Sequence, residues 1–300
     1  MNKLKILLLF TSIFLGCKNE NATTKMQFLI DKIPNNIPLE FNQEMIPKNK
    51  LVHKGIFSPD LKEYYYTISD YNFKKFEIFV TNNDGEHWSK PEKAFINSKY
   101  DEHGMNFSPD GNTLFFSSTR PTSIDGIPQT WHIWKSERIN GVWKEPVFVD
   151  IPNLREKLVS HPTIADTGTL YFHSSNLDYS EMDIYHSKKV NGKFQMAEKT
   201  MISMHAQTVK CTPYISPKED YLIFASVSNQ LDLMISYKDK KGRWTNTKRL
   251  NDKINNNGQG NPYVTPDEQF LFYTTGEHSK KDWKIMWVNI ASQIKDANLE

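Results

Sequence analysis

A unit of about fifty residues recurs five times along the 300-residue chain, and this repeat constrains the fold more than any other feature. Each copy starts with an apolar residue followed by Ser-Pro-Asp or a related turn, and continues into an aromatic-rich segment ending in Ser or Thr. The copies are FSPDLKEYYYTIS from Phe57, FSPDGNTLFFSS from Phe107, IADTGTLYFHSS from Ile164, ISPKEDYLIFAS from Ile215 and VTPDEQFLFYTT from Val264. Successive starts are 50, 57, 51 and 49 residues apart, which predicts a closed array of similar units.

Turn and strand chemistry make each copy a small antiparallel sheet. In Ser-Pro-Asp-Gly, Pro fixes φ, Asp hydrogen-bonds its own backbone and Gly accepts a positive φ, so a hairpin is expected there. A third β-rich segment follows: FEIFVT from Phe76, WHIWKS from Trp131, MDIYHS from Met182, LDLMIS from Leu231 and WKIMWV from Trp283. Fourth strands are expected near residues 94–97, 147–149, 199–202 and 248–250. Four antiparallel strands per copy indicate an all-β, five-bladed β-propeller.

The fifth copy has no fourth strand of its own, and we expect the N-terminal part of the domain to supply it. Pro38-Leu39-Glu40-Phe41 reads as a lone strand that precedes the first copy. If this strand completes the last blade, it closes the ring and covers two sheet edges. The sequence therefore predicts one propeller over residues 37–290 and a C-terminal tail over residues 291–300. Six blades remain the alternative, if one degenerate repeat is misjudged.

The N-terminus carries a targeting pattern. Lys3 and Lys5 precede an apolar run at residues 6–15, which is about half of the ~20 residues that span a bilayer, so residues 1–16 are predicted to be a secretory signal peptide. Phe14-Leu15-Gly16-Cys17 resembles the lipobox of bacterial lipoproteins, which implies that Cys17 is lipidated. Lys18 implies outer-membrane sorting, facing the periplasm or the cell surface. Residues 17–36 then form the lipidated Cys and a flexible tether. A cleaved signal with an incidental cysteine is the alternative.

The charge balance argues against nucleic acid as a partner. The chain has 37 Lys and Arg against 35 Asp and Glu, and loss of Lys3 and Lys5 with the signal peptide leaves 35 against 35. A nucleic-acid binder needs a net basic face. We expect a monomer that meets the membrane only through its lipid anchor.

The segment YDEHGMNFSPDGNTLFFSSTRP from Tyr100 resembles the TolB-like, WD-repeat-like propeller unit of periplasmic and surface proteins. The resemblance extends over all five copies and implies a propeller. It does not imply one function, because the family includes translocation scaffolds, peptidase domains and pectin-degrading lyases. The pectin-degrading lyases hold a metal with histidines in the central funnel.

Candidate ligand-binding residues follow from the propeller topology. Innermost strands line the channel, and the connections that enter them share one face with the loops between second and third strands. The incoming connections supply Lys54, Cys211, Gln259, Asn261 and the candidates His53, Glu102, His103, His161 and Lys210. The loops supply the candidates Asp70, Arg120 and Asn176. The second residue of each third strand is also polar, at Glu77, His132, Asp183, Asp232 and Lys284, and there we expect a structural role.

These residue types suit several kinds of chemistry. Glu102, His103 and Asp70 are the candidate catalytic residues for acid–base work. His53, His103 and His161 could hold a transition metal, or could be separate hydrogen-bonding histidines, so we assign no cofactor. Arg120, with Lys54 and Lys210, could attract an acidic sugar, or Arg120 could anchor its loop through a salt bridge.

Three hypotheses follow for function. The first is a lipid-anchored, extracytoplasmic propeller that binds a glycan or a cell-envelope protein through its funnel without catalysis. The second is a carbohydrate-active enzyme, either a polysaccharide lyase or a glycosidase. The third is an interaction platform with an empty funnel.

Overall fold

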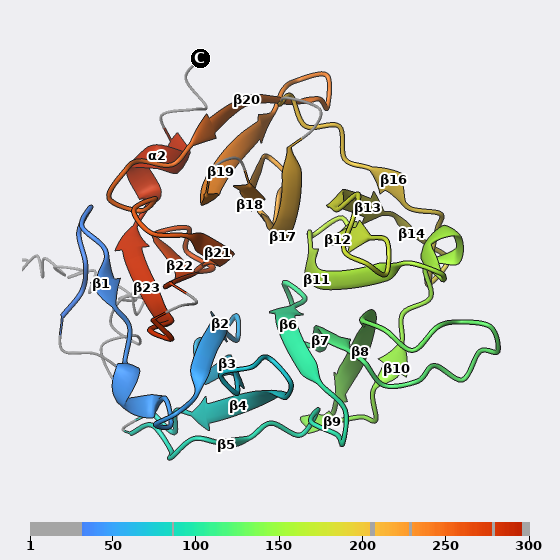
Figure 1. The fold of residues 1–300 in the computed structure, drawn as a ribbon, viewed down its shortest axis with the longest axis horizontal. Helices are drawn as coiled ribbons and strands as arrows, with labels where there is room; N and C mark the ends of the chain where they lie inside the picture. Colours follow the sequence, from blue (N-terminus) through green and yellow to red (C-terminus); the bar gives the residue numbers. More distant parts are fainter. Residues whose placement is uncertain (1–31, 86, 205–207, 228–229, 278–279, 296–300) are drawn as a thin grey trace, which may run out of the picture.

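The computed structural model describes residues 32–85, 87–204, 208–227, 230–277 and 280–295. Five antiparallel sheets stand around a central axis as the blades of a β-propeller (Figure 1). The sequence prediction of an all-β, five-bladed ring is confirmed. The expected signal peptide, Cys17 and most of the tether lie outside the described residues. No helix in the described part of the chain is long and apolar enough to cross a membrane.

The first two blades follow the predicted strand order from the axis outward. Blade 1 consists of β2 (Leu51–Phe57), β3 (Glu63–Ser69), β4 (Phe76–Asn82) and β5 (Glu92–Lys93). Blade 2 consists of β6 (Glu102–Phe107), β7 (Thr113–Ser118), β8 (His132–Ile139) and β10 (Val147–Phe148), and β9 (Val142–Trp143) pairs with the end of β8. β5 lies just before the segment expected from the sequence.

The other three blades repeat this order. Blade 3 contains β11 (Leu158–Ile164), β12 (Leu170–Ser175), β13 (Asp183–Ser187) and β16 (Glu198–Lys199), with a separate hairpin of β14 (Lys189–Val190) and β15 (Lys193–Phe194). Blade 4 contains β17 (Val209–Ile215), β18 (Tyr221–Val227), β19 (Leu231–Lys238) and β20 (Trp244–Arg249). Blade 5 contains β21 (Gln259–Val264), β22 (Phe270–Thr275), β23 (Lys284–Asn289) and β1 (Leu39–Glu40). Short helices η2 (Gln43–Met45), η3 (Pro152–Leu154) and α2 (Ala291–Lys295) lie outside the sheets.

Blade 5 closes the ring with a strand from the start of the domain, as the sequence predicts. β1 pairs antiparallel with β23, with Leu39 opposite Trp287, and β1 lies beside β23 in Figure 1. The Phe41 amide donates to the carbonyl of Ile285 at 2.8 Å. The Phe41 ring is buried against Phe272 and Trp287. Closure therefore rests on backbone pairing and on an apolar anchor.

The polar side chain that recurs near the start of each third strand contacts the fourth strand of the same blade. Ion pairs form in four blades, between Glu77 and Lys93, Asp183 and Lys199, Asp232 and Arg249, and Lys284 and Glu40. In blade 2, the ring of His132 contacts the ring of Phe148 instead. The charges are reversed in the closing blade, where the fourth strand comes from the other end of the domain. The structural role expected for this position agrees with these contacts.

Candidate functional site

The innermost strands share one irregularity that shapes the channel mouth. Each has a shift in register three or four residues before the apolar residue that begins its Ser-Pro-Asp-type turn. At this level four residues have a positive φ: Gly104 (60°), His161 (55°), Thr212 (44°) and Asn261 (54°). Lys54 is at the equivalent position of blade 1. Bulges redirect side chains, and positive φ is strained for a β-branched residue such as Thr212, so this feature marks a candidate functional site.

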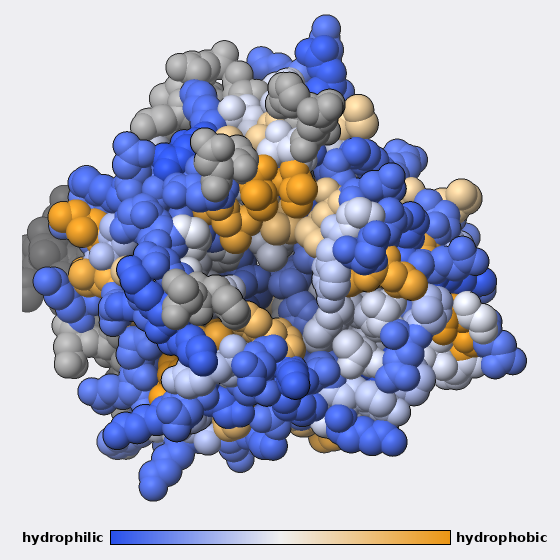
Figure 2. Space-filling view, in the orientation of Figure 1, coloured by the Kyte–Doolittle hydropathy of each residue, from blue (hydrophilic) through white to orange (hydrophobic). Residues whose placement is uncertain are grey.

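A cavity of about 470 Å³ opens at this end of the channel. Apolar walls come from side chains at the start of third strands or in the loops before them, chiefly Phe73, Phe76, Leu231 and Trp283. Figure 2 shows the hollow at the centre of the ring, with hydrophobic residues at its edge over the fourth blade. The size falls within the range of pockets for small ligands. The funnel therefore has room for a small ligand at its mouth.

The three predicted channel histidines all line this pocket. The rings of His103 and His161 are 4.5 Å apart between centroids. His173 on β12 stacks behind His161 at 4.7 Å, and its Nδ1 accepts the Thr212 amide at 3.2 Å. His53 is hydrogen-bonded to the Ser69 hydroxyl at 2.7 Å. The sequence therefore predicted the convergence of three imidazoles correctly, and the structure adds a fourth.

Burial keeps these imidazoles uncharged at neutral pH. It lowers the pKa of His53 and of His173 to about 3. Burial also holds the pKa values of His103 and His161 well below the ordinary value, and the neighbouring positive charges of Lys54 and the other histidines add to the effect. No carboxylate is among the causes. A site of neutral imidazoles can donate and accept hydrogen bonds.

Two polar atoms in the pocket wall are buried and have no hydrogen-bond partner in the described part of the chain. They are the amide oxygen of Asn261 and the indole N–H of Trp283. Buried polar groups in folded proteins are almost always paired, so each orphan calls for an explanation. One is an acceptor and the other a donor, and both belong to residues of the cavity wall.

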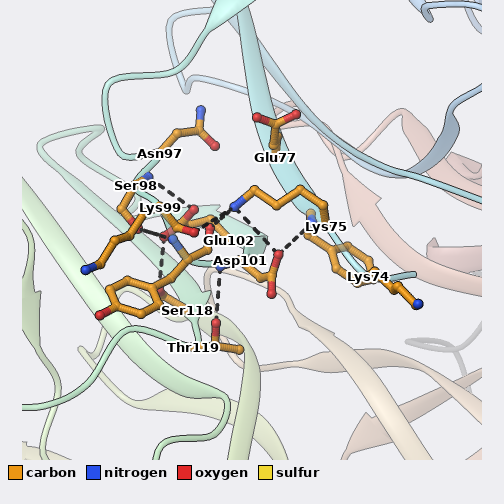
Figure 3. Close-up of polar contacts among 12 residues, drawn as sticks. Lys74, Lys75, Glu77, Asn97, Ser98, Lys99, Asp101, Glu102, Ser118 and Thr119 are labelled. Atoms are coloured by element: carbon orange, nitrogen blue, oxygen red, sulfur yellow. Dashed lines mark hydrogen bonds and ion pairs between the residues drawn. The ribbon is translucent and has the colours of Figure 1, made fainter. Parts of the chain in front are cut away.

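Glu102 and Arg120 are not in the pocket, which corrects two of the sequence-based site assignments. The Glu102 carboxylate is fully buried and accepts a hydrogen bond from Arg120 at 2.9 Å. It also accepts from the hydroxyls of Ser98 at 2.6 Å and Ser118 at 3.1 Å, as Figure 3 shows. Arg120 also donates to the Ile96 carbonyl at 2.8 Å. The loop-anchoring salt bridge, left open by the sequence, is the arrangement found. It fixes the start of β6 and so positions His103.

Three further candidates also have internal partners. Asp70 accepts the backbone amides of Asn72 and Lys74, at 3.0 and 2.9 Å, and so shapes its own loop. Asn176 donates to Ser180 at 2.8 Å and accepts from Lys157. Lys210 is buried in an ion pair with Asp183 at 3.1 Å. None of these three lines the pocket. Asp70 and Asn176 hold their own loops, and Lys210 of blade 4 pairs with Asp183 of blade 3.

A metal chelate of His53, His103 and His161 is not supported by the geometry. Phe76 contacts both His53 and His103, at 5.0 and 5.5 Å between ring centroids, and lies between blades 1 and 2 at the pocket. Over the described ranges, no three His, Cys, Asp or Glu side chains are arranged to hold a metal ion. None of the described residues that line the pocket is a carboxylate, so the pair that glycoside hydrolysis needs is not found among them.

Sequence reasoning missed the aromatic wall although its signal was available. Phe76, Trp131, Leu231 and Trp283 each begin a third-strand segment, at the same place in the repeat. Three of them line the cavity, and Trp131 contacts the His103 ring at 4.0 Å between centroids. Equivalent positions in a propeller meet around the axis, so an apolar residue repeated there predicts an apolar mouth.

No protein-family profile and no curated protein matches the chain. Similar solved structures include TolB from Acinetobacter baumannii, with 15% identity and a TM-score of 0.49 over 81% of this chain and 55% of that one. An oligogalacturonate lyase from Vibrio parahaemolyticus has 10% identity and a TM-score of 0.42 over 84% and 94% of the two chains. A gluconolactonase from Xanthomonas campestris has 10% identity and a TM-score of 0.47 over 86% and 95%. This chain spans about half of the TolB structure. These likenesses concern the propeller fold alone.

Proposed function

We propose that this protein binds a saccharide at the mouth of its propeller channel without catalysis. The proposal rests on the cavity at the channel mouth, where the aromatic side chains of Phe76 and Trp283 lie with the uncharged imidazoles of His103 and His161. Aromatic rings offer flat apolar surfaces to the C–H faces of a sugar ring, while its hydroxyl groups can both donate and accept hydrogen bonds. The neutral imidazoles of the pocket can donate hydrogen bonds to such hydroxyl groups and accept them.

The catalytic alternatives lose their main support. Asp70 and Glu102, the carboxylates considered for acid–base work, are held by their own loop and by Arg120 respectively. His103 stays at the pocket as a neutral imidazole, which suits hydrogen bonding to a ligand. A binding role needs no more than these groups provide.

The experiment is a glycan-array and calorimetric screen of the full chain in detergent, joined to a depolymerisation assay on every saccharide that binds. Trp283→Ala removes one aromatic face from the cavity wall, so affinity should fall about 5- to 10-fold, as for a lost contact of about 1 kcal/mol. Trp143→Ala is the control, because Trp143 lies on β9, is half-buried and does not line the cavity. Binding that neither substitution changes, or depolymerisation of a bound saccharide, would overturn the proposal.

We also propose that the domain acts outside the cytoplasm, tethered to the outer membrane through lipid on Cys17. The support is the basic and then apolar pattern of residues 1–16, followed by the Gly16-Cys17 pair. Several acyl chains are needed for permanent anchoring, since each buried methylene contributes about 0.8 kcal/mol. Mass spectrometry of the mature N-terminus tests this: a lipidated Cys17 is expected, and Cys17→Ser should abolish the lipid. An unmodified N-terminus at another residue would refute the anchor.

A further inference from the structure

Lys54 is a buried lysine without an anionic partner. It lies on β2, at the level where the other innermost strands have their positive-φ residues, and is 3% exposed. Within the described residues, its ammonium group forms no hydrogen bond or ion pair. Lysine is almost never fully buried unless it is paired. This side chain therefore needs an explanation.

Lys210 shows how the same fold treats a buried lysine that serves structure. It is 4% exposed and also lies on an innermost strand, β17. Its ammonium group contacts the Asp183 carboxylate at 3.1 Å and the Thr208 carbonyl at 3.1 Å. Arg120 is likewise paired, with Glu102. The sequence predicts three cations at the funnel, namely Lys54, Arg120 and Lys210. Among these three, Lys54 alone has no carboxylate partner in the described residues.

The surroundings of Lys54 contain positive and neutral donors but no counter-charge. Lys54 does not itself line the pocket, but it is the blade 1 counterpart of His161, Thr212 and Asn261, which do. Its charge also contributes to the low pKa of both His103 and His161. His53 is adjacent in sequence and lines the same cavity, and His173 stacks behind His161. We define His53, Lys54, His103, His161 and His173 as the basic cluster. No carboxylate takes part in the pKa shift of any member.

We propose that the basic cluster binds an oxyanion, so that the saccharide of the proposed function is an acidic one whose anionic group is held by Lys54 with His103 and His161. The inference rests on the proposed function for the sugar and on Lys54 for the anion. A bound oxyanion supplies the missing counter-charge and accepts hydrogen bonds from the ammonium and imidazole groups. The apolar side chains of Phe76 and Trp283 line the same cavity and lower its local dielectric, which strengthens the attraction.

A pH dependence follows from the same groups. Burial lowers the pKa of Lys54 to about 7, so the free protein carries this charge below neutral pH and loses it above. The protonated fraction drops from about 90% at pH 6 to about 10% at pH 8, which should weaken oxyanion binding about 10-fold. The four imidazoles of the basic cluster stay neutral throughout this interval, and a neutral saccharide should bind equally well at both pH values.

The test uses calorimetry on the full chain in detergent with three kinds of probe: oligomers of hexuronates, neutral hexose oligomers of equal length, and inorganic phosphate. Lys54→Met removes the charge and keeps the length of the side chain. It should weaken binding of the charged probes by about 10- to 100-fold, leave neutral oligomers within about 2-fold, and raise the melting temperature, because an unpaired buried charge is lost. Lys62→Met, at the exposed far end of the same hairpin, is the matched control and should change nothing.

The outcomes separate this inference from the proposed function. Binding of neutral and acidic oligomers with equal affinity, unchanged by Lys54→Met, overturns the oxyanion site and leaves saccharide binding intact. Phosphate binding that depends on Lys54, without any saccharide binding, supports the oxyanion site and overturns the saccharide. A lower melting temperature for Lys54→Met, without any loss of phosphate or hexuronate binding, would mean that Lys54 serves the fold and would refute the inference.

Discussion

Replacement of Arg120 by Met tests whether the Glu102–Arg120 pair serves the fold rather than a ligand. Glu102 is fully buried, and three side chains donate hydrogen bonds to it, of which Arg120 supplies the only positive charge seen on it in the described residues. Arg120→Met leaves the two serine hydroxyls in place and strands a carboxylate in the interior. We therefore expect a large loss of stability.

The expected magnitude follows from the burial. Removing one partner of a buried ion pair costs about 3–5 kcal/mol, because the remaining charge is uncompensated. For a domain of this size, that corresponds to a melting temperature lower by about 6–20 °C. Glu102→Gln keeps the size of the side chain and removes its charge, so the double variant Glu102→Gln/Arg120→Met should recover part of the loss.

Thermal unfolding followed by circular dichroism measures all three variants, with Arg155→Met as a control. Arg155 pairs with Asp150 at the exposed surface, so its loss should cost at most about 1 kcal/mol. An Arg120→Met protein that melts within about 2 °C of the wild type but loses ligand binding would refute this reasoning. In that case Arg120 would belong to the site, as the sequence alone suggested.

Three other predictions follow from the blades and the channel. The pKa values of His53 and His173 are about 3 in the folded protein, so the free energy of unfolding should be highest above pH 6.5. It should fall by up to about 1.4 kcal/mol per pH unit for each histidine as the pH drops toward 3. Denaturant titrations at pH 7, 6 and 5 measure the slope, and a flat profile contradicts it. Gly104→Ala should destabilise by at least about 1 kcal/mol in urea titrations, since φ is 60° and the new Cβ would meet the neighbouring imidazole at 3.2 Å; equal stability would show that the bulge relaxes freely. Glu40→Lys should lower the melting temperature by about 1–3 °C and the added change Lys284→Glu should restore it, whereas two additive losses would argue against their ion pair in the closing blade.

Several parts of the site could be predicted from residues alone, and others could not. His53, His103 and His161 could be brought together because repeats of equal length place equivalent positions around one axis. His173 could not, since it lies within a second strand and reaches the site by stacking on His161. The ion-pair partners of Arg120 and Lys210 could not be predicted either, because a polar side chain at this level of the blade can turn toward the channel or toward a buried carboxylate.

The sequence by itself determined the five-bladed ring and its closure by the strand at Leu39, because turns, strand alternation and repeat length are local properties that recur. Only the tertiary structure decided which charges are neutralised. Asp183 removes Lys210 from the funnel and Glu102 removes Arg120, while Lys54 finds no carboxylate among the described residues. Such pairing depends on the direction and depth of each side chain. It depends equally on what the adjacent blade presents at that level, which no pattern along a single chain contains.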